Sequence, residues 1–213
     1  YNVVSSVFID KTGILWVGTS GQGLNIYDPR SNRFSTMVRE KDETSRISGF
    51  SIRSILEDSN GIVWVGSDVL YRWDRLKNEL KSYETSSSTP DDFGNTGPWS
   101  MIEDSEGTIW TATSEGVYNY NPATEKTRQY KFSPENLSGL PEKDVYTVFE
   151  DQQKNIWAIT EYYLCKLTGR ENGIFEHTLR LPIAESSKTP RTVIYQDKQN
   201  IFWIGTRDGL IRY

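Results

Sequence analysis

The chain has 213 residues and an acidic balance, with 24 Lys and Arg against 29 Asp and Glu and a formal net charge of -5 at pH 7. Because no basic stripe is present, nucleic acid is excluded as an expected partner. No apolar run approaches the roughly 18 residues that span a bilayer, so we expect membrane attachment only through a segment outside residues 1–213. The single cysteine, Cys165, excludes an internal disulfide and is expected to be a small buried hydrophobic residue.

Five tryptophans recur at intervals of 46 to 48 residues, and each lies six residues after an aspartate. They are Trp16, Trp64, Trp110, Trp157 and Trp203, following Asp10, Asp58, Asp104, Asp151 and Asp197. A period in the forties predicts repeated copies of one supersecondary unit. We expect the tryptophans to be structural and to pack between neighbouring copies, because their sequence neighbours are apolar.

Within each copy, the elements follow one order. A β-rich run ends at the aspartate, as in residues 7–10, and a turn with glycine three residues later follows, as at Gly13. Copy five has Asn200 at the glycine position and copy four has Lys154, so we expect a distorted turn in copy four. The tryptophan strand comes next, then a third strand such as residues 23–27, and a less regular fourth strand such as residues 33–36.

Four antiparallel strands in every 46 to 48 residues are typical of a β-propeller blade. The sequence therefore predicts an all-β fold and one partial propeller over residues 1–213. We expect the blades at approximately residues 1–47, 48–94, 95–141, 142–188 and 189–213. The last copy lacks a fourth strand, so we expect an incomplete fragment of a larger propeller.

The pattern Asp-x-x-Gly-x-(Ile/Leu/Val)-Trp-(Val/Ile)-Gly-Thr, followed by Gly-Leu and an aromatic with Asp-Pro, resembles the two-component regulator propeller repeat. Copies one and five match it best, whereas copies two and four have Val69 and Tyr163 in place of the glycine before the third strand. Stretches such as residues 51–61 are similar to the sensor regions of hybrid two-component systems of gut Bacteroidetes. The resemblance implies seven-bladed propellers in the periplasm, outside a membrane helix and a cytoplasmic histidine kinase.

The resemblance also implies the function and partners. It predicts a sensor that detects oligosaccharides or other small ligands and regulates polysaccharide-utilisation genes. The expected protein partners are further propeller repeats of the same parent chain and a second copy of the parent in a homodimer. No cofactor and no metal site are expected, since one histidine and one cysteine leave only carboxylates as ligands. Two alternatives stay open, namely a scaffold or dimerisation propeller that binds no ligand and a glycan-active propeller enzyme.

No catalytic set can be assembled from the sequence. His177 is the single histidine and stands in the irregular fourth strand of copy four, so we interpret it as a surface or edge-strand residue. Glu57, Glu103 and Glu150 recur directly before the aspartate in three copies. We interpret this column as a shared structural or solvated position, because a catalytic pair need not repeat. The fragment itself is therefore not expected to be an enzyme.

Recognition is expected where the copies differ. Five residues before each aspartate, at the start of the innermost strand, the copies carry Ser5, Arg53, Trp99, Tyr146 and Thr192. The loops between the second and third strands open at the same end and carry Tyr162 and Arg207. Aromatic rings offer platforms for sugar C–H faces, and arginine can hydrogen-bond hydroxyl groups. The predicted ligand-binding residues are Arg53, Trp99, Tyr146, Tyr162 and Arg207.

Overall fold

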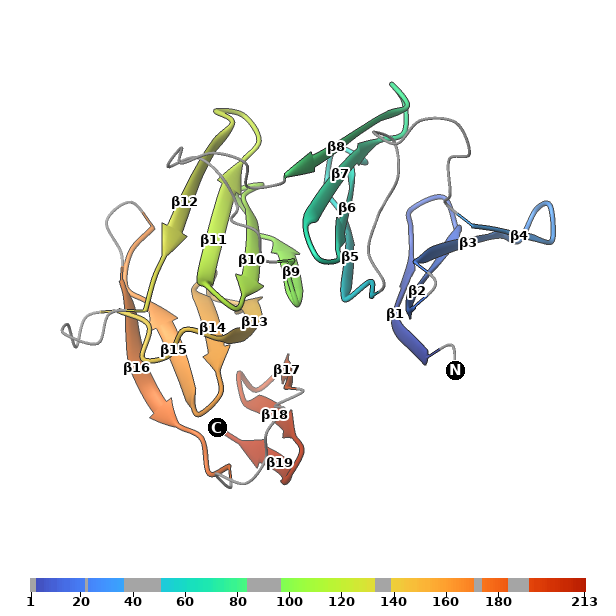
Figure 1. Cartoon of the computed structure of the whole chain (residues 1–213). Helices are drawn as coiled ribbons and strands as arrows, with labels where there is room; N and C mark the ends of the chain where they lie inside the picture. Colours follow the sequence, from blue (N-terminus) through green and yellow to red (C-terminus); the bar gives the residue numbers. More distant parts are fainter. Residues whose placement is uncertain are drawn as a thin grey trace. The chain divides into compact units, whose positions relative to one another are not determined.

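The computed structural model describes residues 3–21, 23–36, 51–83, 97–132, 139–170, 174–183 and 192–213. All its regular elements are β-strands, arranged in five separate antiparallel sheets that follow one another along the sequence (Figure 1). Four sheets have four strands, and the described strands of the last sheet number three. The prediction of an all-β chain made of propeller blades is confirmed.

The blades are as follows. Blade 1 comprises β1 (Val3–Ile9), β2 (Leu15–Ser20), β3 (Leu24–Asp28) and β4 (Arg33–Thr36). Blade 2 comprises β5 (Ser54–Glu57), β6 (Val63–Gly66), β7 (Leu70–Asp74) and β8 (Glu79–Tyr83). Blade 3 comprises β9 (Ser100–Glu103), β10 (Ile109–Thr113), β11 (Gly116–Asn121) and β12 (Lys126–Tyr130). Blade 4 comprises β13 (Val145–Glu150), β14 (Ile156–Thr160), β15 (Tyr163–Leu167) and β16 (Phe175–Arg180). Blade 5 comprises β17 (Val193–Gln196), β18 (Phe202–Thr206) and β19 (Gly209–Arg212).

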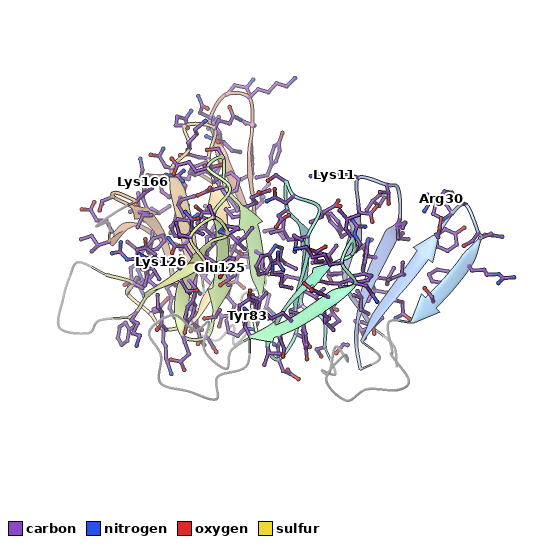
Figure 2. All side chains as sticks on the ribbon, turned by 90° about the horizontal axis from the view of Figure 1, so that it is seen from above. Lys11, Arg30, Tyr83, Glu125, Lys126 and Lys166 are labelled. Carbon is purple, nitrogen blue, oxygen red and sulfur yellow. The ribbon has the colours of Figure 1, made fainter. Side chains whose placement is uncertain are left out.

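Each strand pairs with the next one along the chain, so every blade is a simple meander. The turns between the first and second strands and between the third and fourth strands therefore lie at one end of each sheet. Figure 2 labels one side chain from each of these turns in blade 1, Lys11 and Arg30. We call this end the turn end of a blade and the other end its loop end.

The chain divides into two compact units, Tyr1–Glu103 and Asp104–Tyr213. In the first unit, the core contains Trp16 and Leu24 of blade 1 packed with Val63, Val65 and Tyr71 of blade 2. Burying such apolar surface between two sheets is the main stabilising term for the pair. Blades 1 and 2 are therefore held together by the apolar side chains on the facing surfaces of their two sheets.

The core of the second unit follows the same rule. It contains Trp157 and Leu164 of blade 4 packed with Phe202 and Ile204 of blade 5, and the rings of Trp157 and Phe202 meet edge to face with centroids 5.0 Å apart. Cys165 is buried, as predicted, and burial raises the pKa of its thiol to about 12. A neutral, enclosed thiol is a packing residue rather than a nucleophile.

Some expectations fall on parts of the chain that are not described. The blade boundaries expected near residues 47, 94 and 188 lie outside the described residues. The same holds for most of the long connection between Thr85 and Pro98 and for the side chain of His177. Among the described residues, no helix is long and apolar enough to span a lipid bilayer.

Candidate functional site

The turn end of every blade is built around one aspartate. In all five blades one carboxylate oxygen, Oδ2, accepts a hydrogen bond from the indole Nε1 of the tryptophan six residues later, at 2.6–3.0 Å. The other oxygen, Oδ1, accepts the backbone N–H four residues later, at 2.7–3.0 Å. The tryptophans of blades 1–3 are at most 1% exposed. The prediction that the tryptophan column is structural is confirmed.

The turn of blade 4 is not distorted, and that expectation was wrong. Lys154 donates its N–H to the carbonyl of Asp151 at 2.9 Å, the bond that Gly13 makes to Asp10 in blade 1. Lys154 takes a φ of 65°, the left-handed conformation that glycine adopts more easily. The hydrogen bonds to the aspartate therefore impose the turn geometry even on a residue with a Cβ atom.

Glu57, Glu103 and Glu150 tie each blade to the blade before it. Glu103 accepts bonds from the backbone N–H and the hydroxyl of Ser59, at 2.7 and 2.5 Å. Glu57 accepts the N–H of Lys11 at 2.9 Å, and Glu150 binds Ser105. In blade 5, Gln196 replaces the glutamate and accepts the N–H of Gln152 at 2.7 Å. The interpretation of this column as a structural position is confirmed.

Two arginines strengthen this network, and sequence reasoning missed both. Arg75, after β7, binds Asp10 at 2.5 Å and also binds Glu57. Arg170, after β15, binds Asp104 at 2.6 Å and Glu150 at 2.9 Å. The sequence signal was an arginine within three residues after the third strand, which copy one also carries as Arg30. At the turn end, these ion pairs join blade 1 to blade 2 and blade 3 to blade 4.

The loop end carries the side chains that differ from blade to blade. In the first unit, Arg53 donates to the carbonyl of Ser67 and to Asp68 Oδ1, the latter at 3.1 Å. Gly97 packs against this group, since a Cβ atom there would lie 1.5 Å from the Ser67 oxygen and 2.9 Å from Arg53 Nη1. The half-buried Trp99 follows two residues later. The structure therefore brings Arg53 and the segment that carries Trp99 together, and we call this group the arginine cluster.

The arginine cluster faces water in part. The side chains of Arg53 and Asp68 are 34% and 58% exposed. An ion pair this exposed contributes at most about 1 kcal/mol to stability. The ion pair between Arg53 and Asp68 is therefore weak, and both of its groups are accessible to solvent.

In the second unit, Tyr146 and Tyr162 lie among carboxylates at the loop end of blade 4. Burial raises the pKa of Tyr146 to about 12, helped by the negative charges of Asp144, Glu161 and Glu142 and by Tyr162. Burial and the charge of Glu161 also raise the pKa of Asp144. We call these five residues the tyrosine cluster. Sequence reasoning named both tyrosines but none of the three carboxylates.

Specific contacts order the tyrosine cluster. The backbone N–H of Tyr162 donates to Glu142 Oε2 at 2.9 Å, which ties the loop before β13 to the turn before β15. The neighbouring Lys143 pairs with Glu115 at 2.6 Å. The arrangement places two half-buried phenol rings beside several hydrogen-bond acceptors.

Arg207, the remaining predicted residue, is exposed in the turn between β18 and β19. The hydroxyl of Thr206 organises this turn, because it accepts the N–H of Asp208 at 3.2 Å and donates to the Gly209 carbonyl at 2.9 Å. Among the described residues, no group of three or more His, Cys, Asp and Glu side chains is arranged to hold a metal ion.

Three stretches of the chain, residues 1–21, 46–68 and 186–208, match the family model described as "Two component regulator propeller". Histidine kinase P4 of Formosa agariphila is 30% identical to the chain over 164 residues, which make up 76% of this chain and 12% of the kinase. The chain therefore spans only a small part of this relative.

Solved structures share the fold at low sequence identity. The extracellular domain of BT3049 from B. thetaiotaomicron, described as a hybrid two component system, superposes with a TM-score of 0.80 at 22% identity, over 100% of this chain and 28% of that one. Virginiamycin B lyase from Staphylococcus aureus superposes with a TM-score of 0.68 at 14% identity, over 100% of this chain and 70% of the lyase. The chain thus shares the propeller fold of the extracellular domain of BT3049, and three of its stretches match the two component regulator propeller model.

Proposed function

We propose that the chain is part of the periplasmic sensor region of a two-component histidine kinase, and that it binds an oligosaccharide at the loop ends of its blades. One observation carries this proposal. The turn ends repeat the same aspartate, tryptophan and glutamate contacts, whereas the loop ends carry aromatic and charged side chains that differ between blades. Repeated positions maintain the fold, and varied positions are free to recognise a ligand.

The chemistry of the loop ends suits a sugar. The rings of Tyr146 and Tyr162 offer apolar surface for sugar C–H groups, and Glu142, Asp144 and Glu161 accept hydrogen bonds from hydroxyl groups. The exposed pair of Arg53 and Asp68 adds a donor and an acceptor in the other cluster. Binding would bias the arrangement of subunits in a homodimer and so regulate genes for polysaccharide use.

Isothermal titration calorimetry of the chain against a broad panel of plant and host oligosaccharides tests this proposal. Tyr162→Ala and Trp99→Ala should each weaken the binding of a positive ligand at least tenfold, a loss of about 1.4 kcal/mol. Tyr195→Ala, which removes an exposed tyrosine on β17, is the matched control and should leave affinity unchanged. Absence of heat across the whole panel, or equal losses in all three variants, would count against a sugar site at the loop ends.

A further inference from the structure

The first strands of three blades each carry a hydroxyl group that bonds to the following blade towards the loop end. The donors are Ser5 Oγ, Ser54 Oγ and Thr147 Oγ1, and the acceptors are the backbone carbonyls of Ile52, Pro98 and Thr192. Two of these carbonyls stand directly before a predicted recognition residue, because Arg53 follows Ile52 and Trp99 follows Pro98. The hydroxyl groups therefore hold the chain at the place where the blades differ.

Ser54 makes its bond through a narrow gap. Its hydroxyl donates to the Pro98 carbonyl at 3.0 Å, and Gly66 lies opposite Ser54 in the ladder between β5 and β6. A Cβ atom at Gly66 would lie 2.4 Å from Ser54 Oγ and 2.6 Å from the Pro98 oxygen. Only glycine leaves room for both groups. The glycine two residues after Trp64 therefore allows this contact between blades 2 and 3.

The segment that Ser54 holds is the one that carries Trp99. Gly97 and Pro98 are buried, and Trp99 is half-buried. Gly97 packs against the guanidinium of Arg53, so the segment already touches the arginine cluster at this residue. The bond from Ser54 to Pro98 is a second attachment, one residue closer to Trp99. Two adjacent residues of β5 and its lead-in, Arg53 and Ser54, thus hold the two residues that precede the ring.

We propose that Ser54 is a positioning residue for the arginine cluster, and that its bond to Pro98 fixes Trp99 in place beside Arg53. The inference rests on the proposed function, because it assigns Trp99 and Arg53 to one ligand site. Ser54 acts through the segment that carries Trp99 rather than by touching the ligand. A ring that is fixed before the ligand arrives loses less conformational entropy on binding, which raises the affinity.

Thr147 provides a matched control within the chain. Its hydroxyl donates to the Thr192 carbonyl, also at 3.0 Å, in the second unit, whereas Trp99 belongs to the first. Val193, which follows Thr192, is not a predicted recognition residue. Thr147→Val exchanges the hydroxyl for a methyl group of similar size, so it removes the same kind of bond without touching the segment that carries Trp99.

The first test compares Ser54→Ala and Thr147→Val with the wild type by NMR, without any ligand. Ser54→Ala should shift the indole N–H resonance of Trp99 and weaken the nuclear Overhauser effect between Gly97 Hα and the side chain of Arg53. Thr147→Val should leave both signals as they are in the wild type. A lost hydrogen bond that mattered only for overall stability would affect the two variants alike.

The second test measures affinity for an oligosaccharide that binds the wild-type chain in the calorimetric panel. Ser54→Ala should weaken binding about fivefold, which corresponds to ~1 kcal/mol for one hydrogen bond. Thr147→Val should leave the affinity within about twofold. In the Trp99→Ala background, Ser54→Ala should have no further effect, because a residue that acts through Trp99 has nothing left to position.

The proposal is overturned if Ser54→Ala leaves the Trp99 resonance and the Gly97 contact unchanged, or if Thr147→Val alters them equally. It is also overturned if Ser54→Ala weakens sugar binding as much in the Trp99→Ala background as in the wild type. If no sugar in the panel binds, the proposed function fails, and the NMR comparison still decides whether Ser54 fixes Trp99.

Discussion

The carboxylate of Glu150 accepts hydrogen bonds from both the backbone nitrogen and the hydroxyl group of Ser105, each at 2.9 Å. The two residues lie in neighbouring blades. Glu103 binds Ser59 through the same pair of atoms. The first strands of blades 2–5 therefore each end in a side chain that accepts a backbone N–H bond from the turn of the preceding blade.

Glu150→Ala should lower the free energy of unfolding by about 1–3 kcal/mol, because it leaves the N–H of Ser105 and the guanidinium of Arg170 without this acceptor. Chemical denaturation measures this loss. Glu176→Ala, at an exposed position on β16, is the control and should stay within about 0.5 kcal/mol of the wild type. Similar losses in both variants would show that the contact between the blades contributes nothing.

Trp110→Ala should destabilise the chain by about 3–5 kcal/mol, because Trp110 is 1% exposed and its removal leaves a cavity and takes away one of the hydrogen-bond donors to Asp104. Trp203 makes the same bond to Asp197 but is only half-buried. Trp203→Ala should therefore cost clearly less. Thermal unfolding of both variants gives the comparison, and a larger effect at Trp203 would contradict the buried role of the column.

Lys154→Gly should stabilise the chain by about 0.5–1 kcal/mol, because glycine adopts the φ of 65° without the Cβ clash that lysine suffers there. The carbonyl of residue 154 would still accept the bond from Arg170. Lys198→Gly, an exposed turn position without a positive φ, should be neutral or destabilising. The melting temperatures of the two variants, compared with that of the wild type, test this prediction. A lower melting temperature for Lys154→Gly than for the wild type would refute it.

Tyr146 should make stability fall at alkaline pH. Its pKa is raised to about 12 in the folded state, against about 10 in an unfolded chain. The folded state therefore holds the phenol proton more firmly, and this contribution is complete below about pH 10 and is lost as the pH rises towards about 12. In Tyr146→Phe, the unfolding free energy should fall less steeply over that window. An unchanged slope in Tyr146→Phe would refute the assignment.

Much of the fold follows from the sequence, because the signals repeat. An aspartate six residues before a tryptophan carries little information once, but five copies in register predicted the strands, the turns and the buried rings. The glutamate column was recognised as structural for the same reason. The prediction at Lys154 was wrong because it considered only the low preference of lysine for a positive φ. It left out the hydrogen bond from the Lys154 N–H to the Asp151 carbonyl, which holds the turn in this conformation.

The candidate site was less predictable. The pairing of Arg53 with Asp68 and the carboxylates around Tyr146 arise from segments whose spacing differs between copies. Arg75 and Arg170 were missed because each binds an aspartate about 65 positions away, in the neighbouring blade. Such contacts depend on how neighbouring sheets pack, and a single sequence gives no register for that packing.

Glu57, Glu103 and Glu150 each accept a hydrogen bond from a backbone N–H group, which every residue except proline provides. If a blade comes after a different blade in the chain, its glutamate can therefore form the same bond whatever side chain the turn of the preceding blade carries. Duplication, deletion or exchange of single repeats would keep this joint intact, while the loop ends diversify independently. Arrays of such units can change their recognition surface piece by piece without redesigning what holds them together.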